Sequence, residues 1–300
     1  MEQRLVPALS APATAADIVE MAATFQPDVL VIDCMMEAAF GAARTLALPT
    51  ALLVHLSYAG WTLTRADEEL QRARAGYVSD MDAVLALVPP GFEIPVPMPR
   101  HAAYVGPILN PNPLPALDPA DAAMLSEPGL PWVLLSLSTT VQGQTTALPS
   151  LLEALSGLPV RCLLTLGGVL APEAVQAPAN VVVRSFLSHD LVLPHMSVVL
   201  SHGGLSTITA SLAAGVPLVC VPQGRDQHDN AARVDICGLG RTVSPQASSA
   251  ELAAQIQRTL SNDSYRRAAQ RFAAAIAVLG RGATATDQVE ALLQRTRHTR

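Results

Sequence analysis

The sequence predicts an α/β protein with two parallel-sheet domains, the first of them incomplete. From Trp132 onward, short β-rich runs alternate with helical patterns, the order expected of parallel strands joined by crossover helices. Residues 1–106 show the same alternation, but about three or four strands are too few for a full domain when a βαβ unit takes ~30 residues. The proline-rich segment 107–131 predicts an extended linker, because proline restricts φ and removes backbone donors. The domain after it is expected over residues 132–283, followed by a C-terminal helix in 284–300.

The individual elements follow from local composition. Strands are expected at the apolar, β-rich runs 27–33, 49–56, 132–138, 160–166, 180–186, 197–201 and 217–222. Helices are expected at 15–25, 37–46, 148–156, 206–214, 227–237, 250–260, 263–279 and 284–297. Strand followed by helix is therefore the rule in both domains.

Charge and cysteine usage limit the possible partners. A net charge of -6 offers no basic field for nucleic acid or an anionic membrane surface. The four cysteines lack CxxC spacing, so neither a disulfide framework nor a zinc site is predicted, and a reducing cytoplasm fits best. The most apolar long stretch, residues 45–61, is interrupted by Pro49 and His55 and is interpreted as buried strand and loop. We expect a cytoplasmic protein without stable membrane insertion.

Lysine is absent, and all nineteen basic residues are arginine. This excludes a Walker A phosphate loop, a pyridoxal Schiff base and an SxxK nucleophile, since each requires a lysine at one position. A phosphate group would have to be held by backbone N–H groups, hydroxyls, imidazole or arginine. No GxSxG motif supports a serine hydrolase.

The first candidate site lies where the run 197–201 meets the next helix. His202, Gly203 and Gly204 follow the expected strand, and Ser206 and Thr207 begin the expected helix. Ligands of open α/β sheets bind beyond the carboxyl ends of the strands, and a helix N-terminus presents unpaired N–H groups to anions. Glycines would let a phosphate approach the backbone. A ligand-free capped turn is an equally good interpretation of this motif alone.

The loop after the next strand carries a second polar pair, Asp226 and Gln227. Adjacent loops would bring this pair and His202 to one rim, where the two side chains suit the vicinal hydroxyls of a sugar. An aspartate before a helix is also a common N-cap, so either residue alone has a purely structural alternative.

Residues 180–243 resemble the donor-binding half of GT-B glycosyltransferases of the UDP-glycosyltransferase family, in particular the bacterial macrolide type. The resemblance combines HGG, GVP, DQ and GLG motifs at family-like spacing. It covers nearly the whole chain from Pro131, where WVLLSLSTT is similar to the first strand of that half, and is weaker at PDVLVIDCMMEAAFGAA in residues 27–43.

The resemblance implies a nucleotide-diphospho-sugar as donor substrate, no cofactor and no metal. It implies that His202, Ser206 and Thr207 contact the diphosphate, beside Gly203 and Gly204. It further assigns six residues. Thr139 and Thr140 would line the cleft, and the backbone of Phe186 and Leu187 would face the nucleobase. Asp226 and Gln227 would hold the sugar hydroxyls.

Two departures from the family pattern affect this assignment. Ala210 replaces a glutamate that would bind ribose hydroxyls. We therefore expect a deoxythymidine donor to lose less binding affinity than a uridine donor. The family's base, a histidine in a loop after its first strand, has no counterpart, because the chain opens at a point that resembles the interior of the first domain. Asp33 matches the aspartate that orients this histidine and is expected to lack its partner. His55 could act as a base or line the acceptor pocket, although a structural role satisfied by backbone is favoured.

The sequence therefore predicts a glycosyltransferase that moves a hexose from a UDP- or dTDP-sugar to a hydroxyl of a small lipophilic acceptor, with inversion. The alternative is a non-catalytic nucleotide-sugar-binding protein or an inactive truncated transferase, which a missing base favours. A GT-B-like sugar-nucleotide epimerase is a weaker alternative. A sheet that lacks its leading strands exposes an edge and apolar faces, which predicts self-association.

Overall fold

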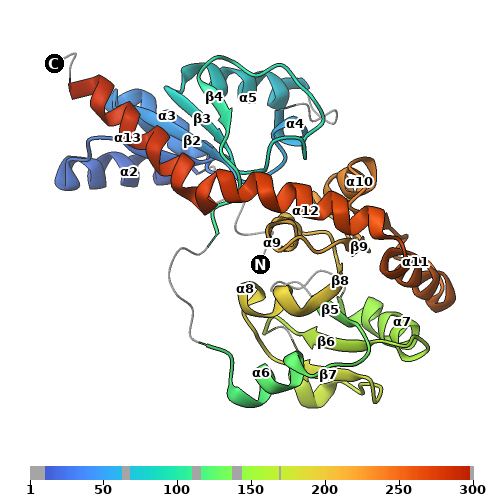
Figure 1. The fold of residues 1–300 in the computed structure, drawn as a ribbon. Helices are drawn as coiled ribbons and strands as arrows, with labels where there is room; N and C mark the ends of the chain where they lie inside the picture. The colour runs from blue at the N-terminus through green and yellow to red at the C-terminus, as the bar shows by residue number, and fades with distance from the viewer. Residues whose placement is uncertain (1–10, 63–67, 110–115, 137–143, 169, 298–300) are drawn as a thin grey trace. The chain divides into compact units, whose positions relative to one another are not determined.

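The computed structural model describes residues 11–62, 68–109, 116–136, 144–168 and 170–297 and divides into two compact units (Figure 1). The first unit comprises Met1–Ile108 and Leu279–Arg300, and the second comprises Leu109–Val278. Each contains one parallel sheet, as the alternating sequence pattern predicts.

The first unit has a four-stranded sheet in the order β1-β2-β3-β4, with every neighbouring pair parallel. Its strands are β1 (Leu30–Asp33), β2 (Thr50–Val54), β3 (Ala83–Ala86) and β4 (Ala102–Tyr104). Its helices are α2 (Pro12–Phe25), α3 (Glu37–Leu46), α4 (Tyr58–Thr62), α5 (Glu68–Asp80) and α13 (Ala283–Arg297). Because β1 and β2 are parallel neighbours, the residues after them share one edge of the sheet.

The C-terminal helix α13 belongs to the first unit although it follows the second in sequence. Its Ala285 and Leu292 are buried in one cluster with Ala51 of β2 and Ala83 and Leu85 of β3. Apolar residues on one side of α13 thus cover part of the first sheet. The arginine-rich end of the sequence gave no indication of this packing.

The second unit has a six-stranded sheet in the order β10-β9-β8-β5-β6-β7, parallel throughout. Its strands are β5 (Trp132–Ser136), β6 (Arg161–Thr165), β7 (Val181–Arg184), β8 (Met196–Ser201), β9 (Leu218–Cys220) and β10 (Gly240–Thr242). Its helices are α6 (Pro119–Ser126), α7 (Gln144–Ser156), α8 (His189–Val192), α9 (Leu205–Ala213), α10 (Gln227–Ile236), α11 (Ser249–Ser261) and α12 (Asp263–Val278). Two short 3-10 helices, η1 (Pro172–Ala174) and η2 (Leu193–His195), also belong to this unit. A third, η3 (Gly280–Gly282), precedes α13 in the first unit.

Helices on both faces bury the central strands of this second sheet. Val133 and Leu135 of β5 pack in a cluster with α7 and α11, whereas Leu134, pointing to the opposite face, is also fully buried. Strands covered on both faces read as continuous apolar runs, which is why the sequence located them within one or two residues. The central strands therefore hold the loops at their carboxyl ends on a rigid base.

The expectation that residues 107–131 form an extended linker is wrong for Pro119–Ser126, which form α6. Asp118 caps this helix by accepting a hydrogen bond from the N–H of Ala120 at 2.8 Å, and Pro119 takes the first helical position, where a missing N–H costs nothing. The buried Asp121 of α6 accepts a bidentate ion pair from Arg184 of β7, with N–O distances of 2.5 to 3.2 Å. Helix α6 is thus bound to the edge of the second sheet.

The most apolar stretch of the sequence is part of the first unit's core. Residues 45–61 contain the end of α3, the buried strand β2 and most of α4, as the interpretation of buried strand and loop predicts. Of the helices in the described ranges, none is both long and apolar enough to cross a lipid bilayer.

Candidate functional site

A pocket of about 390 Å³ lies at the carboxyl ends of the strands of the second sheet. Ser136 ends β5 and Thr165 ends β6, and the remaining walls come from the loops after β6, β7 and β8. Its lining includes six of the residues predicted from sequence to bind the donor: Phe186, Leu187, His202, Gly204, Ser206 and Thr207. Residues separated by about twenty positions are brought together because β7 and β8 lie on either side of β5 and β6 in the sheet.

Two glycines shape the turn between β8 and α9. Gly203 has a φ of +85°, a conformation that side chains disfavour, and its N–H donates to Ser201 Oγ at 3.1 Å. A Cβ on Gly204 would lie 2.5 Å from Nε2 of His202, so only a glycine leaves room for the ring in this position. The HGG sequence is therefore required by the placement of the imidazole in the pocket.

The His202 ring is held in a desolvated environment. Burial lowers its pKa, and the backbone of Ser136 and the carboxylate of Asp226 offset this only in part, while Arg225 adds to the lowering. Nδ1 is buried and, among the described residues, has no partner at hydrogen-bond geometry. The ring is thus neutral at pH 7 and has an unused polar atom, which is unusual for a buried group without a ligand.

The N-terminus of α9 faces the same pocket. Gly204 is its N-cap and provides no side-chain cap, so the first N–H groups of the helix stay available to an anion. Ser206 in this turn is exposed, whereas Thr207 is 8% exposed and lines the pocket wall. Backbone N–H groups, hydroxyls and imidazole are the phosphate ligands that a chain without lysine has to use.

Asp226 and Gln227 hold the neighbouring loop and do not line this pocket. Oε1 of the buried Gln227 accepts from the N–H groups of Gln223 at 2.7 Å and Gly224 at 3.2 Å. Nδ2 of the fully buried Asn230 donates to Asp226 at 2.8 Å and to the carbonyl of Gly203 at 3.2 Å. Asn230, which sequence analysis missed, therefore links the start of α10 to the HGG turn.

Sequence analysis also missed His189 and Ser136. Nε2 of His189 lies 3.3 Å from Oγ of Ser136, and both side chains line the pocket. These residues are 53 positions apart, so only the pairing of β5 with β8 and β6 brings them together. Thr139 and Thr140 lie outside the described residues.

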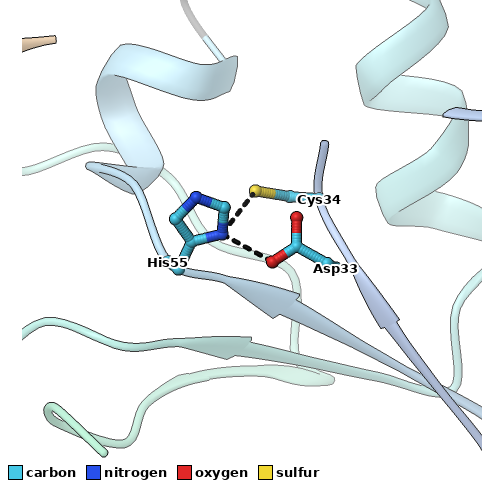
Figure 2. Close-up of side chains that lie close together, drawn as sticks. All are labelled: Asp33, Cys34 and His55. Atoms are coloured by element: carbon cyan, nitrogen blue, oxygen red, sulfur yellow. Dashed lines mark hydrogen bonds and ion pairs between the residues drawn. The ribbon is translucent and has the colours of Figure 1, made fainter. Parts of the chain in front are cut away.

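In the first unit, the structure corrects the expectation that Asp33 lacks a histidine partner. Nδ1 of His55 lies 2.6 Å from Oδ2 of Asp33 and 3.8 Å from Sγ of Cys34 (Figure 2). The parallel register places Asp33 opposite Leu53, so a histidine two residues beyond Leu53 reaches the carboxylate. The backbone-satisfied role favoured for His55 is therefore wrong as well.

This pairing shifts both pKa values toward the charged forms. The hydrogen bond to Asp33, followed by that to Cys34, raises the pKa of His55 to about 10 against the opposing effect of burial. Burial favours the neutral form of Asp33, but the hydrogen bonds from His55 and from the N–H of Met35, at 2.8 Å, outweigh it and lower the pKa. At neutral pH the pair is an aspartate and an imidazolium, and both side chains are more than a third exposed.

The cluster of Asp33, Cys34 and His55 comes nearest, in the described part of the chain, to a metal-binding arrangement, with donor atoms within 4.8 Å of one another. Two nitrogen or oxygen ligands of one tetrahedral zinc ion are about 3.3 Å apart, given metal–ligand distances of about 2.0–2.1 Å. The 2.6 Å separation of His55 and Asp33 is shorter than this and is that of a charge-assisted hydrogen bond. The arrangement therefore fits a proton-transferring pair better than a metal site.

Glu93 supports the loop that follows His55. Its buried carboxylate accepts from the N–H groups of Tyr58 at 3.1 Å and Ala59 at 3.0 Å, and from Oγ of Ser57 at 3.2 Å. It thereby satisfies the N-terminus of the short helix α4, which sequence analysis did not predict. Asp33 thus holds the His55 ring, and Glu93 holds the residues that follow it.

Comparison with known proteins shows what the second half of the chain is similar to. Residues 149–292 match the family "Erythromycin biosynthesis protein CIII-like, C-terminal domain". The demethyllactenocin mycarosyltransferase of Streptomyces fradiae is 36% identical over 169 residues, which are 56% of this chain and 37% of that protein. Residues 149–292 are therefore similar to the C-terminal domain of that family, and the chain shares the GT-B fold of solved glycosyltransferases.

A second similar protein is the 4'-demethylrebeccamycin synthase of Lentzea aerocolonigenes, 33% identical over 176 residues. That match covers 57% of this chain and 41% of the relative, so the chain aligns with less than half the length of either protein. The similarity lies mostly in the second unit, where the HGG turn and its pocket are found.

Solved glycosyltransferase structures show the fold of the whole described chain. The calicheamicin glycosyltransferase CalG4 superposes with a TM-score of 0.73 at 21% identity, covering 98% of this chain and 82% of that one. The glycosyltransferase VinC in complex with dTDP superposes with a TM-score of 0.70 at 22% identity, covering 97% of this chain and 78% of that one. At such identities the likeness concerns the GT-B fold alone.

Proposed function

We propose that this protein transfers a hexose from a UDP- or dTDP-sugar to a hydroxyl of a small lipophilic acceptor, with inversion at the anomeric carbon. The observation that carries the proposal is the pocket at the HGG turn, where neutral imidazole, hydroxyls and the N-terminus of α9 converge, with no lysine or arginine among the described lining residues. Sequence similarity supports it, since one similar protein is the demethyllactenocin mycarosyltransferase.

The donor nucleotide would occupy this pocket. The diphosphate would accept hydrogen bonds from His202, Ser206, Thr207 and the first N–H groups of α9. The ring of Phe186, 70% exposed at the pocket wall, offers a face on which a nucleobase can stack. Ala210 on α9 offers no carboxylate to ribose hydroxyls, and solved relatives hold thymidine diphosphate, which together favour a deoxythymidine donor.

Asp226 and Gln227 would position the donor sugar from the adjacent loop. They bind Asn230, Gln223 and Gly224, so the loop that carries them is ordered by its own side chains. Sugar recognition by this pair would require those hydrogen bonds to be shared with the sugar hydroxyls.

His55 and Asp33 would supply the base. Nδ1 of His55 faces Asp33, and once the imidazolium has lost a proton to solvent, Nε2 of the neutral ring can take the proton from the acceptor hydroxyl as its oxygen attacks the anomeric carbon. The bond from that carbon to the diphosphate oxygen then breaks, and the nucleoside diphosphate leaves with the charge met by the donors of the pocket. Asp33 would stabilise the imidazolium that forms, as an orienting carboxylate does in other His–Asp pairs.

The decisive experiment is titration of the full chain with dTDP and with UDP, followed by mass-spectrometric detection of glycosylated products from a dTDP-sugar and a panel of lipophilic alcohols and phenols. His202→Ala should weaken dTDP binding by roughly ten- to a hundredfold, the equivalent of about 1.4–2.8 kcal/mol. His195→Ala is the matched control, because that histidine does not line the pocket. Unchanged affinity in His202→Ala would contradict the site, and binding without product at any pH from 7 to 10 would leave a nucleotide-sugar-binding protein.

A further inference from the structure

The donor pocket contains a second histidine whose role the HGG turn does not explain. His189 begins α8 directly after the wall formed by Phe186 and Leu187, and its Nε2 lies 3.3 Å from Oγ of Ser136 at the end of β5. Ser136 is only 2% exposed. The ring of His189 is therefore fixed at the base of the pocket by a side chain of the central strand.

His189 and His202 are the only titratable side chains among the described residues that line this pocket. The chain has no lysine, and the lining includes no arginine. A diphosphate carries at least two negative charges, and burying them without a compensating charge is costly. Hydroxyls and helix N–H groups donate hydrogen bonds but bring no full positive charge, so among the described lining residues only these two rings can become cations.

Both rings are neutral at pH 7. Burial lowers the pKa of His189, and the neighbouring Asp190 of α8 offsets this only in part. Burial also lowers the pKa of His202, the backbone of Ser136 and the carboxylate of Asp226 raise it in part, and Arg225 lowers it further. The hydroxyl of Ser136, which contacts His189, is uncharged. A bound dianion would reverse this balance, because an opposite charge within about 4–6 Å favours the protonated form.

We propose that His189 is a second anion-binding residue of the pocket, and that His189 and His202 together hold the donor diphosphate as a pair of imidazolium ions. The proposal rests on the proposed function, since it requires that the pocket take a nucleoside diphosphate. Each ring gains one proton from the solvent when the ligand binds, and it returns that proton when the nucleoside diphosphate leaves. The donor affinity is therefore linked to pH through the binding site itself.

Proton linkage gives this pair a measurable signature. Above pH 7 the nucleotide's own phosphate, with a pKa near 6, is almost fully ionised, so proton uptake reports mainly on the protein. Each ring that becomes protonated on binding should make dTDP affinity fall by up to tenfold per pH unit in this range. Two rings should produce a steeper decline than one.

The test is isothermal titration calorimetry of the full chain with dTDP at pH 7.5, in two buffers that differ in ionisation enthalpy. The number of protons taken up follows from the difference in the observed enthalpies. The unmodified chain should take up close to two protons. His189→Gln, whose amide can still bond Ser136 but cannot gain a proton, should take up close to one and bind dTDP about tenfold more weakly. His195→Gln, outside the pocket, should match the unmodified chain.

The outcomes separate this inference from the function on which it rests. Failure of the unmodified chain to bind dTDP or UDP would overturn both. Binding with equal proton uptake by the unmodified chain and His189→Gln would overturn the role of His189 alone. If His189→Gln does not fold, uptake by the unmodified chain decides: about two protons support the pair, and one or none overturns it.

Discussion

The two units place histidines at the same kind of position, the carboxyl end of a parallel strand, but in opposite electrostatic settings. In the first unit, His55 meets the carboxylate of Asp33 at 2.6 Å and remains 43% exposed, and its pKa rises to about 10. In the second unit, His189 and His202 are surrounded by apolar walls and hydroxyls, and burial lowers the pKa of both. Neighbouring groups, rather than the fold position, decide which rings are charged.

This difference suits two different tasks. A ring that is neutral in an empty pocket can gain charge when an anion enters, and so responds to its ligand. A ring already paired with a carboxylate has its tautomer and orientation fixed before any substrate binds. The same side chain is thus adapted to binding in one unit and to orientation for proton transfer in the other.

The largest expected effect concerns the pair in the first unit. Because a general base contributes about 10²–10⁴-fold, His55→Gln should lower sugar transfer by that factor without changing dTDP affinity. Only neutral imidazole accepts a proton, so with a pKa of about 10 the transfer rate should rise about tenfold per pH unit between pH 7 and 9. The rate of product formation at saturating donor, measured across this range, checks both statements.

Asp33→Asn separates the two halves of this prediction. Without the carboxylate, the pKa of His55 should return toward its usual value, so the pH profile should flatten above pH 7 while the rate at pH 9 falls. NMR titration of the His55 ring measures the pKa directly. Asp28→Asn, at an exposed position before β1, is the control and should leave both quantities unchanged. A His55 ring that titrates near 6.5 in the unmodified chain would show that the pair does not hold a proton at neutral pH.

The sequence predicted the framework around these sites better than the sites themselves. The second sheet was located from its continuous apolar runs, and α3 from Glu37 to Leu46 at both ends, because burial on two faces or on one helical stripe leaves a pattern in the sequence. Strands β4, β9 and β10 have three residues each, but only β9 lies in a continuous apolar run, at 217–222, and only β9 was predicted. Helix α6 was hidden by prolines that start it.

Contacts between distant residues were the part that local patterns could not supply. His55 and Asp33 did end two neighbouring strands, so their approach could have been inferred from parallel pairing and register alone. The contact of His189 with Ser136 depends on the order of strands in the sheet, which no local pattern specifies. The residues of the HGG turn were found because their backbone requirements restrict the sequence itself.

The next effect, smaller than that of His55, tests the shape of the donor pocket. Gly204→Ala places a Cβ where Nε2 of His202 lies, at 2.5 Å in the present conformation, so the ring has to move away from the pocket. We expect dTDP affinity to fall on the order of tenfold, about 1.4 kcal/mol, by calorimetry. Gly157→Ala, where a Cβ would meet nothing within 4 Å, is the matched control. Full affinity in Gly204→Ala would mean that His202 does not need its present position.

The smallest effect is on stability, and its sign should differ between the units. The pKa of His55 is higher in the folded chain than its unfolded value near 6.5, so its stabilisation is complete below pH 6.5 and is lost as pH rises toward about 10. The pKa values of His189 and His202 are lower in the folded chain than in the unfolded chain. As pH falls below 6.5, protonation therefore favours the unfolded chain, and the free energy of unfolding decreases.

Urea unfolding at pH 5.5, 7 and 9 can resolve these opposite slopes if each unit is followed by its own probe, since two units need not unfold together. The rings of Trp61 in the first unit and Trp132 in the second are both buried and supply such probes through single-tryptophan variants. His55→Gln should remove the loss between pH 7 and 9 in the first unit, about 1 kcal/mol or less because the pair is partly exposed. His189→Gln should reduce the loss between pH 7 and 5.5 in the second unit and leave the first unchanged. Parallel pH slopes in the two units would contradict the opposite tuning of their histidines.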